Sequence, residues 1–246
     1  MKVILSPSQI RIAYMNLLQQ DIKIYKVKFS FATFLWFLLA FLAVLLKIRL
    51  GYDHIKNFMI FRNAFWHTLH QINLYNIYPS EKLDVYLYGP AFSILISPFA
   101  LFPIYAGAFL WGVTNAAILF FAIRKLPVGF KNQNIILLIS AVEMMTCLEN
   151  MQSNCLLAAL IILAFIFVKD GKDFWAALFV AVGFLVKLYG IVGIVFILFS
   201  NNKLKFIGSF LLWVAILFCL PMLISSPSFT VQSYFDWYHA LIVKDN

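Results

Sequence analysis

Charged residues are scarce in this chain, and their scarcity excludes a water-soluble globular fold. Only 12% of the 246 residues are Asp, Glu, Lys or Arg, whereas 63% are hydrophobic. Soluble domains average about 25% charged and about 45–50% apolar residues, so this chain would leave many apolar side chains in water. A lipid bilayer removes that conflict, because apolar side chains are stable when they face lipid. The composition therefore predicts an integral membrane protein.

Cysteine is also scarce, and dense basic runs are missing. Cys147, Cys155 and Cys219 lie in or beside apolar stretches without metal-ligand spacing, which excludes a disulfide framework. The net charge of +9 comes from lysines and arginines at the ends of apolar segments. This pattern indicates membrane topology and argues against nucleic-acid binding. The first long apolar run starts near Phe29, too deep for a cleavable signal peptide, so we expect an anchor that stays.

Apolar runs divide the chain into an arm and a multi-spanning domain. Residues 1–28 form a basic, partly amphipathic arm, and residues 29–246 form the membrane domain. The expected spans are 29–46, 104–123, 134–148, 154–168, 174–186, 191–200 and 206–224. The run 91–103 is about half as long as the roughly 20 residues of a full crossing, so we predict a re-entrant element there. The expected fold is an all-α polytopic bundle.

The basic residues orient this bundle. With 91–103 re-entrant, the arm and the loops near residues 124–131, 169–172 and 203–205 carry most of the basic residues and face the cytoplasm. The loop 51–90, the turn 149–154, the end of the span at Lys187 and the tail 225–246 then share the outer face. We expect a bacterial inner-membrane protein with its N-terminus in the cytoplasm.

The outer loop 51–90 contains a predicted amphipathic helix. Large apolar residues recur at steps of three and four from Phe58 to Leu69, which is typical of a helix lying on the membrane surface. Asp53 precedes this helix and is expected to cap it. His67 and His70 are three residues apart, but no third ligand follows, so we predict no metal site.

Polar residues within or beside the spans are candidates for function. Glu143 and Lys187 interrupt apolar segments, where a charge costs several kcal/mol and usually faces a cavity or a partner. Snorkelling to the headgroups is the alternative for Lys187. Asp84 lies in a tyrosine-rich turn with Tyr88, and a carboxylate there suits acid/base chemistry or sugar binding.

Taken in order, these pieces resemble a known family. The motifs are Leu74-Tyr75, Tyr78-Pro79, Tyr86-x-Tyr88-Gly89-Pro90, Trp111, Asn115, Gln152-Ser153-Asn154 and Lys187-Leu188-Tyr189-Gly190. Over roughly residues 50–240 the chain resembles glycosyltransferase family 87 of the GT-C superfamily, which is typified by mannosyltransferases that use polyprenyl-phosphate sugars. The resemblance implies a hexosyltransferase whose donor is a polyprenyl-phosphate hexose and whose acceptor is a glycan or lipid on the non-cytoplasmic face. It implies no further cofactor.

The resemblance also implies roles for individual residues. Asp53 or Asp84 would be the catalytic base, and Lys187 with Arg62 would meet the phosphate. Gln152 and Asn154 would bind sugar hydroxyls or the phosphate. The full substrate-binding set is Asn57, Arg62, Tyr88, Glu143, Gln152, Asn154, Lys187 and Tyr189.

Two departures from the family pattern leave alternatives open. Asn57 stands where the family commonly carries an acidic residue, and an amide is no base at neutral pH. The chain also stops at Asn246, where family members usually continue with further spans, so we expect a C-terminally truncated member. A non-catalytic membrane scaffold and a transporter or flippase subunit are the alternatives. The second would explain Glu143 and Lys187, but the chain has no inverted repeat.

Overall fold

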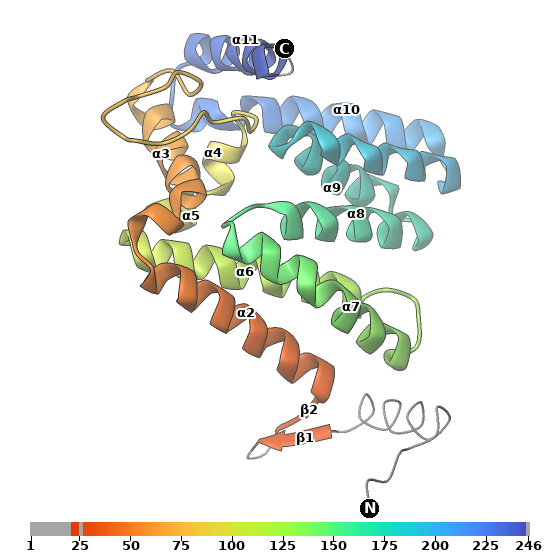
Figure 1. Ribbon diagram of the computed structural model, residues 1–246. Helices are drawn as coiled ribbons and strands as arrows, with labels where there is room; N and C mark the ends of the chain where they lie inside the picture. Colours follow the sequence, from red (N-terminus) through yellow and green to blue (C-terminus); the bar gives the residue numbers. More distant parts are fainter. Residues whose placement is uncertain (1–20, 25–26, 245–246) are drawn as a thin grey trace, which may run out of the picture.

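The computed structural model describes residues 21–24 and 27–244 and is a bundle of helices (Figure 1). Two short strands, β1 (Asp21–Ile24) and β2 (Val27–Ser30), pair antiparallel before the first helix. The other elements are α2 (Phe31–Arg49), η1 (Tyr52–His54), α3 (Lys56–His70), α4 (Phe92–Leu95), α5 (Ser97–Ala100), α6 (Ile104–Arg124), α7 (Phe130–Glu149), α8 (Asn154–Lys169), α9 (Asp173–Val186), η2 (Leu188–Phe199), α10 (Lys203–Cys219), η3 (Leu220–Leu223) and α11 (Pro227–Lys244). The helical bundle confirms the predicted fold class, and the small hairpin is an addition that the sequence did not suggest. The predicted arm 1–28 lies mostly outside the described residues.

Three helical segments of the described chain are long and apolar enough to cross a bilayer. They are Phe31–Arg49, Ile104–Arg124 and Lys203–Leu223. The apolar elements α8, α9 and η2 are shorter and pack beside them. The protein is therefore an integral membrane protein.

Helices α2 and α6 run antiparallel, so the segment between them stays at one end of the bundle. The Trp36 indole donates to the Ala116 carbonyl at 3.1 Å. Val44 packs directly against Gly112, at a distance where a Cβ on residue 112 would collide with the Val44 side chain. Residues 91–103 form the one-turn helices α4 and α5 at this end. We call it the loop end; residues 51–103 define it. The re-entrant placement of residues 91–103 and the sidedness of the loop end stay predictions.

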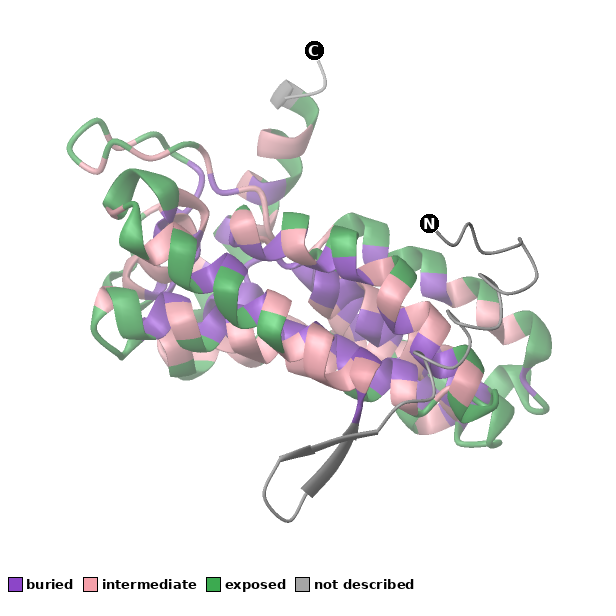
Figure 2. Cartoon of the chain, turned by 60° about the horizontal axis from the view of Figure 1, so that its bottom comes forward, coloured by how far each residue is buried: buried purple, intermediate pink, exposed green. Residues whose placement is uncertain are grey.

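Helix α3 presents its apolar stripe to the protein. Phe58, Phe61 and Phe65 are buried, and the Phe61 ring lies edge-on to Phe92 at 5.1 Å and to Trp111 at 5.9 Å. Figure 2 shows buried residues running along the inward faces of the helices. The predicted amphipathic helix thus exists, and much of its apolar face is occupied by α4, α5 and α6. Its depth in the bilayer stays a prediction.

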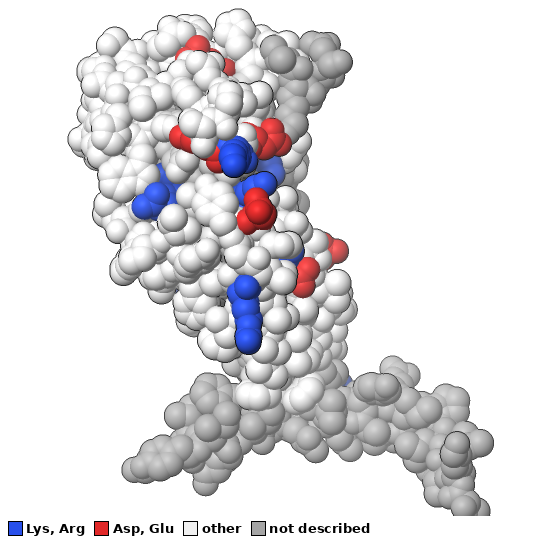
Figure 3. Space-filling model, turned by 60° about the vertical axis from the view of Figure 1, so that its left-hand side comes forward, with Lys and Arg blue, Asp and Glu red and all other residues white. Residues whose placement is uncertain are grey.

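A polar cluster closes the end of the bundle opposite the loop end. The Arg124 guanidinium donates to Thr33 at 2.8 Å, to Asn134 at 2.7 Å and to Ser30 at 3.2 Å. These bonds join the start of α2, the end of α6 and the start of α7. In Figure 3, acidic and basic side chains gather on the side that carries α3 and the loop after it, and much of the other described surface in view is uncharged.

Candidate active site

A cavity of about 210 Å³ opens at the loop end of the bundle. We call it the Lys187 cavity, and it lies between α3, residues 84–88, the α7–α8 turn and the end of α9. Five predicted site residues line it: Asn57, Asp84, Tyr88, Gln152 and Lys187. They come from segments up to 130 positions apart in sequence, so their meeting is a property of the fold.

Lys187 lies at a break between two helices. Helix α9 ends at Val186, and the Lys187 backbone is extended (φ −155°, ψ 130°) before η2 begins. Its ammonium nitrogen is 5.4 Å from the Tyr88 ring centroid and 5.5 Å from that of Tyr189. A cation over aromatic faces is stabilised by the ring quadrupoles. Lys187 is half-buried and lines the cavity, and this geometry favours a functional role over snorkelling.

The Tyr88-Gly89-Pro90 motif docks on the end of α9. The Gly89 amide donates to the Val186 carbonyl at 3.2 Å, and a Cβ at position 89 would collide with the Leu185 carbonyl oxygen. Only glycine allows this approach of two main chains. The contact explains why Tyr88 lies beside Lys187, which follows Val186 directly.

The α7–α8 turn presents Gln152 to the cavity. Met151 has a left-handed backbone (φ 50°), and its carbonyl accepts a 3.1 Å hydrogen bond from the Trp111 indole. The Asn57 amide donates to the Asn150 carbonyl at 2.7 Å. Each bond comes from a different helix, so α6 and α3 together fix the turn that carries Gln152.

Further bonds hold the start of α8. The Asn115 side-chain oxygen accepts from the Leu156 amide at 3.3 Å, and the Cys147 thiol donates to the Gln152 carbonyl at 3.3 Å. The Asn154 amide donates to the Gln152 side-chain oxygen at 2.7 Å. Trp111, Asn115 and Cys147 are therefore positioning residues, a role that sequence reasoning missed. Their polar atoms within apolar runs were the available signal.

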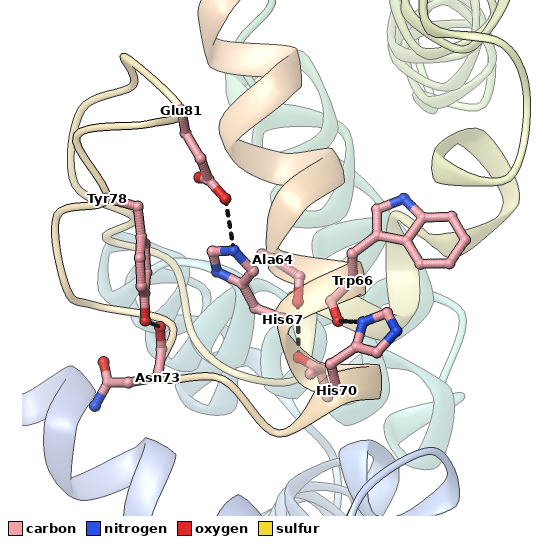
Figure 4. A network of polar contacts seen from close by, with 8 residues as sticks. Ala64, Trp66, His67, His70, Asn73, Tyr78 and Glu81 are labelled. Carbon is pink, nitrogen blue, oxygen red and sulfur yellow. Dashed lines mark hydrogen bonds and ion pairs between the residues drawn. The ribbon is translucent and has the colours of Figure 1, made fainter.

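Asp84 lines the Lys187 cavity, on a loop that is tied to α3. Figure 4 shows these ties at His67, Glu81, Tyr78 and Asn73. The His67 ring nitrogen bonds the Glu81 carboxylate at 2.8 Å, and the same ring packs edge-on against Tyr78 at 4.8 Å. The Tyr78 hydroxyl in turn donates to the Asn73 carbonyl at 2.7 Å. These ties hold the loop whose exposed Asp84 carboxylate lines the cavity.

Asp53 lies outside the Lys187 cavity, in the exposed turn η1. Its carboxylate pairs with the Lys56 ammonium at 2.9 Å, and that hydrogen bond lowers the pKa of Asp53 below its usual value. The residue at the start of α3 is Ile55, which makes no side-chain cap. The expected capping by Asp53 is therefore wrong. The main chain makes a short 3₁₀ turn there, and the carboxylate faces Lys56 in that turn.

Four other predicted residues do not line the Lys187 cavity. The Arg62 guanidinium lies 5.7 Å from the Trp66 ring centroid, and Tyr189 is 74% exposed. Glu143 and Asn154 line a separate groove of about 330 Å³ along α6, α7 and α8, which we call the α7–α8 groove. Gln152 lines both the groove and the Lys187 cavity.

The two histidines of α3 have different partners. His67 bonds Glu81, whereas His70 bonds the Trp66 carbonyl at 2.8 Å. Within residues 21–24 and 27–244, no three His, Cys, Asp or Glu side chains are grouped as a metal would require.

Helix α11 was missed by sequence reasoning, which treated residues 225–246 as a tail. Its Trp237 indole donates to the Leu87 carbonyl at 3.0 Å, and its Asp236 accepts from Asn73 at 2.7 Å. The helix therefore covers the segment that carries Asp84. Pro227 at its first position was a signal for a helix start.

Comparison with known proteins identifies the family. The sequence model of Glycosyltransferase family 87 matches residues 86–245, a range that includes Tyr88, Gln152 and Lys187. No curated protein and no solved structure matches the chain. The matched range covers more than half of the chain. It includes three of the five predicted residues that line the Lys187 cavity. The chain belongs to glycosyltransferase family 87.

Proposed function

We propose that this chain transfers a hexose such as mannose from a polyprenyl-phosphate donor to an acceptor on the non-cytoplasmic face of a bacterial inner membrane. One observation carries the proposal: a carboxylate, a cation and two amides, from Asp84, Lys187, Asn57 and Gln152, line one cavity. A sugar phosphate needs these groups, because the phosphate requires positive charge and the attacking hydroxyl requires a base.

In the proposed reaction the acceptor hydroxyl oxygen attacks the anomeric carbon of the donor. A new C–O bond forms there as the bond from that carbon to the phosphate oxygen breaks. The phosphate leaves with the electron pair as polyprenyl phosphate, and Asp84 takes the hydroxyl proton. Lys187 stabilises the negative charge on the departing phosphate.

The electrostatics of the cavity support a phosphate on the Lys187 side. Helix α8 starts at Asn154, two residues after Gln152, and a helix N-terminus carries a partial positive charge. Gln152 and Lys187 both line the cavity, so the α8 terminus is two residues along the chain from the cavity wall. Gln152 supplies both a donor and an acceptor for phosphate or sugar oxygens.

The α7–α8 groove supports the choice of a polyprenyl donor. Its walls include Leu119, Ile123, Ile136 and Ile162, so they are largely aliphatic. Because Gln152 lines both the groove and the Lys187 cavity, a lipid chain in the groove would place its phosphate beside this residue. Apolar burial of that chain would add to donor affinity.

A transfer assay tests the proposal directly. The purified chain in lipid nanodiscs is given labelled polyprenyl-phosphate mannose and a mixture of membrane glycolipids. We expect Asp84→Asn to lower turnover by about 10²–10⁴-fold while donor binding persists. Asp53→Asn is the matched control and keeps the full rate. A normal rate in Asp84→Asn, or a loss confined to Asp53→Asn, would move the base away from Asp84. No transfer from any polyprenyl-phosphate hexose would favour a scaffold.

A further inference from the structure

A second cavity shares Asp84 with the Lys187 cavity. It has a volume of about 680 Å³, within the range of about 300–1,000 Å³ for small-molecule sites. We call it the α11 cavity, because α11 forms one wall with Asp236 and His239, and residues 73–87 form the other. Asp84 lines both this cavity and the Lys187 cavity. A ligand in either space therefore reaches the same carboxylate.

The polar groups of the α11 cavity are held in fixed orientations. One Asp236 carboxylate oxygen accepts from the Asn73 amide at 2.7 Å, and the other accepts from Gln232 at 2.8 Å. A carboxylate oxygen accepts more than one hydrogen bond, so each Asp236 oxygen keeps capacity for a ligand hydroxyl. Asn73 is fixed as well, since its side-chain oxygen accepts from the Tyr75 amide at 2.8 Å.

The charged groups of the α11 cavity differ from those of the Lys187 cavity, where Asp84 is accompanied by a lysine. Asp84, Asp236 and His239 are the ionisable residues that line the α11 cavity, and its lining among the described residues includes no Lys or Arg. Two carboxylates repel an anionic ligand, whereas hydroxyl donors suit them. Leu87 and Ala240 add apolar surface, against which the C–H face of a sugar ring can pack.

We infer that the α11 cavity binds the acceptor and that the acceptor carries an uncharged carbohydrate head. The inference rests on the proposed function, which leaves the acceptor open. An acceptor hydroxyl beside Asp84 would give its proton to that carboxylate. Its oxygen would then bond the anomeric carbon in the Lys187 cavity as the bond from that carbon to phosphate breaks. Donor and acceptor would occupy two cavities that share one base, and the two ligands would differ in charge.

Thiol protection tests the site without requiring turnover. Ile77 lines the α11 cavity and is 64% exposed, so Ile77→Cys offers a reactive thiol there. The background carries Cys219→Ser, because Cys219 is exposed whereas Cys147 and Cys155 are buried. Ser80→Cys is the matched control, since Ser80 is exposed on the same loop but does not line the cavity.

The probes are methyl hexosides and the corresponding hexose 6-phosphates, competing with a maleimide reagent on the whole chain in nanodiscs. Protection divides the labelling rate by 1 + [L]/Kd, so a bound methyl hexoside at about nine times its Kd slows labelling about tenfold. We expect this at position 77 and no change at position 80. Asp236→Asn should bring the protection by hexose 6-phosphates closer to that by methyl hexosides. One of the two carboxylates that repel the phosphate is then replaced by an amide.

Two outcomes would overturn the inference. Equal or better protection by hexose 6-phosphates would remove the charge argument, and no protection by any methyl hexoside would remove the site. The proposed function fails independently of these results. Protection at position 77 without transfer from a polyprenyl-phosphate donor supports a carbohydrate site in the α11 cavity and rejects the proposed donor. Transfer from a polyprenyl-phosphate donor without protection at position 77 supports the proposed function and removes the assignment of the α11 cavity as the acceptor site.

Discussion

The side-chain amide of Asn57 donates a 2.7 Å hydrogen bond to the main-chain carbonyl of Asn150. This bond ties α3 to the turn that carries Gln152. By the resemblance described above, the family commonly has an acidic residue at this position. A carboxylate has no hydrogen to donate, so it would face the Asn150 carbonyl as a second acceptor. In this chain the position has a structural contact, and Asp84 is the carboxylate that lines the cavity.

Asn57→Asp should therefore lower the stability of the folded chain and should not create a catalytic base. We expect a loss of about 1–3 kcal/mol in the free energy of unfolding, because a hydrogen bond is replaced by two facing acceptors. Thermal unfolding in detergent measures it, with Asn63→Asp on the same helix as the control. A rise in transfer rate in Asn57→Asp would contradict the assignment of Asp84 as base.

Lys187→Met should lower turnover as well as donor affinity, because the proposed cation meets the donor phosphate and also the charge that develops on it as it leaves. Contacts between a charged group and phosphate contribute about 1.5–3 kcal/mol, so the donor KM should rise about tenfold to a hundredfold. The methionine keeps the length of the side chain against Tyr88 and removes only the charge. Lys169→Met, at the exposed far end of α8, is the control. An unchanged donor KM in Lys187→Met would show that this cation does not meet the phosphate.

His67→Ala should loosen the loop that carries Asp84. The variant removes the bond to Glu81 and the contact with Tyr78, which costs on the order of 1 kcal/mol of local stability. Trypsin cleavage after Lys82, an exposed residue with positive φ, should then become about fivefold faster, since cleavage follows the open population. His54→Ala in the exposed turn η1 is the control. Equal cleavage of both variants would mean that other contacts hold the loop.

Reporter fusions should place the two ends of the bundle on opposite sides of the membrane. Arg124 lies in the polar cluster and Asp84 at the loop end, so a fusion after Lys125 or Lys172 should report cytoplasm and one after Asp84 the outer side. Fusions after Lys125 and Asp84 that report the same side would show that residues 91–103 are wrongly assigned as re-entrant.

Local patterns predicted the helices well but not their partners. The run 104–123 is almost the observed α6, because a long apolar segment that ends in Arg and Lys has few other stable forms in a bilayer. Helix α11 was missed because polar residues such as Gln232 and Asp236 interrupt its apolar positions. Its stability depends on contacts with the segment 71–91, which the local sequence does not contain.

The candidate site was predicted in its residue types and only partly in its geometry. Lys187 and Gln152 stood out because they are polar within or beside apolar runs. Asp53 and Asp84 looked similar in sequence, since both are carboxylates in the loop 51–90. Only the fold separates them, because it pairs Asp53 with Lys56 and brings Asp84 to the cavity.

The junction beneath Lys187 is built from main chain against main chain. Gly89 meets the carbonyl of Leu185, and Gly190 meets the backbone of Gly183, with no side chain between them. Neighbouring side chains cannot make room for a larger residue at these contacts, since the obstacle is a peptide unit. We therefore expect side chains around the cavity to tolerate substitution more readily than Gly89 and Gly190. A larger residue at either glycine would push the two main-chain segments apart, and a substitution of a neighbouring side chain would not relieve the collision.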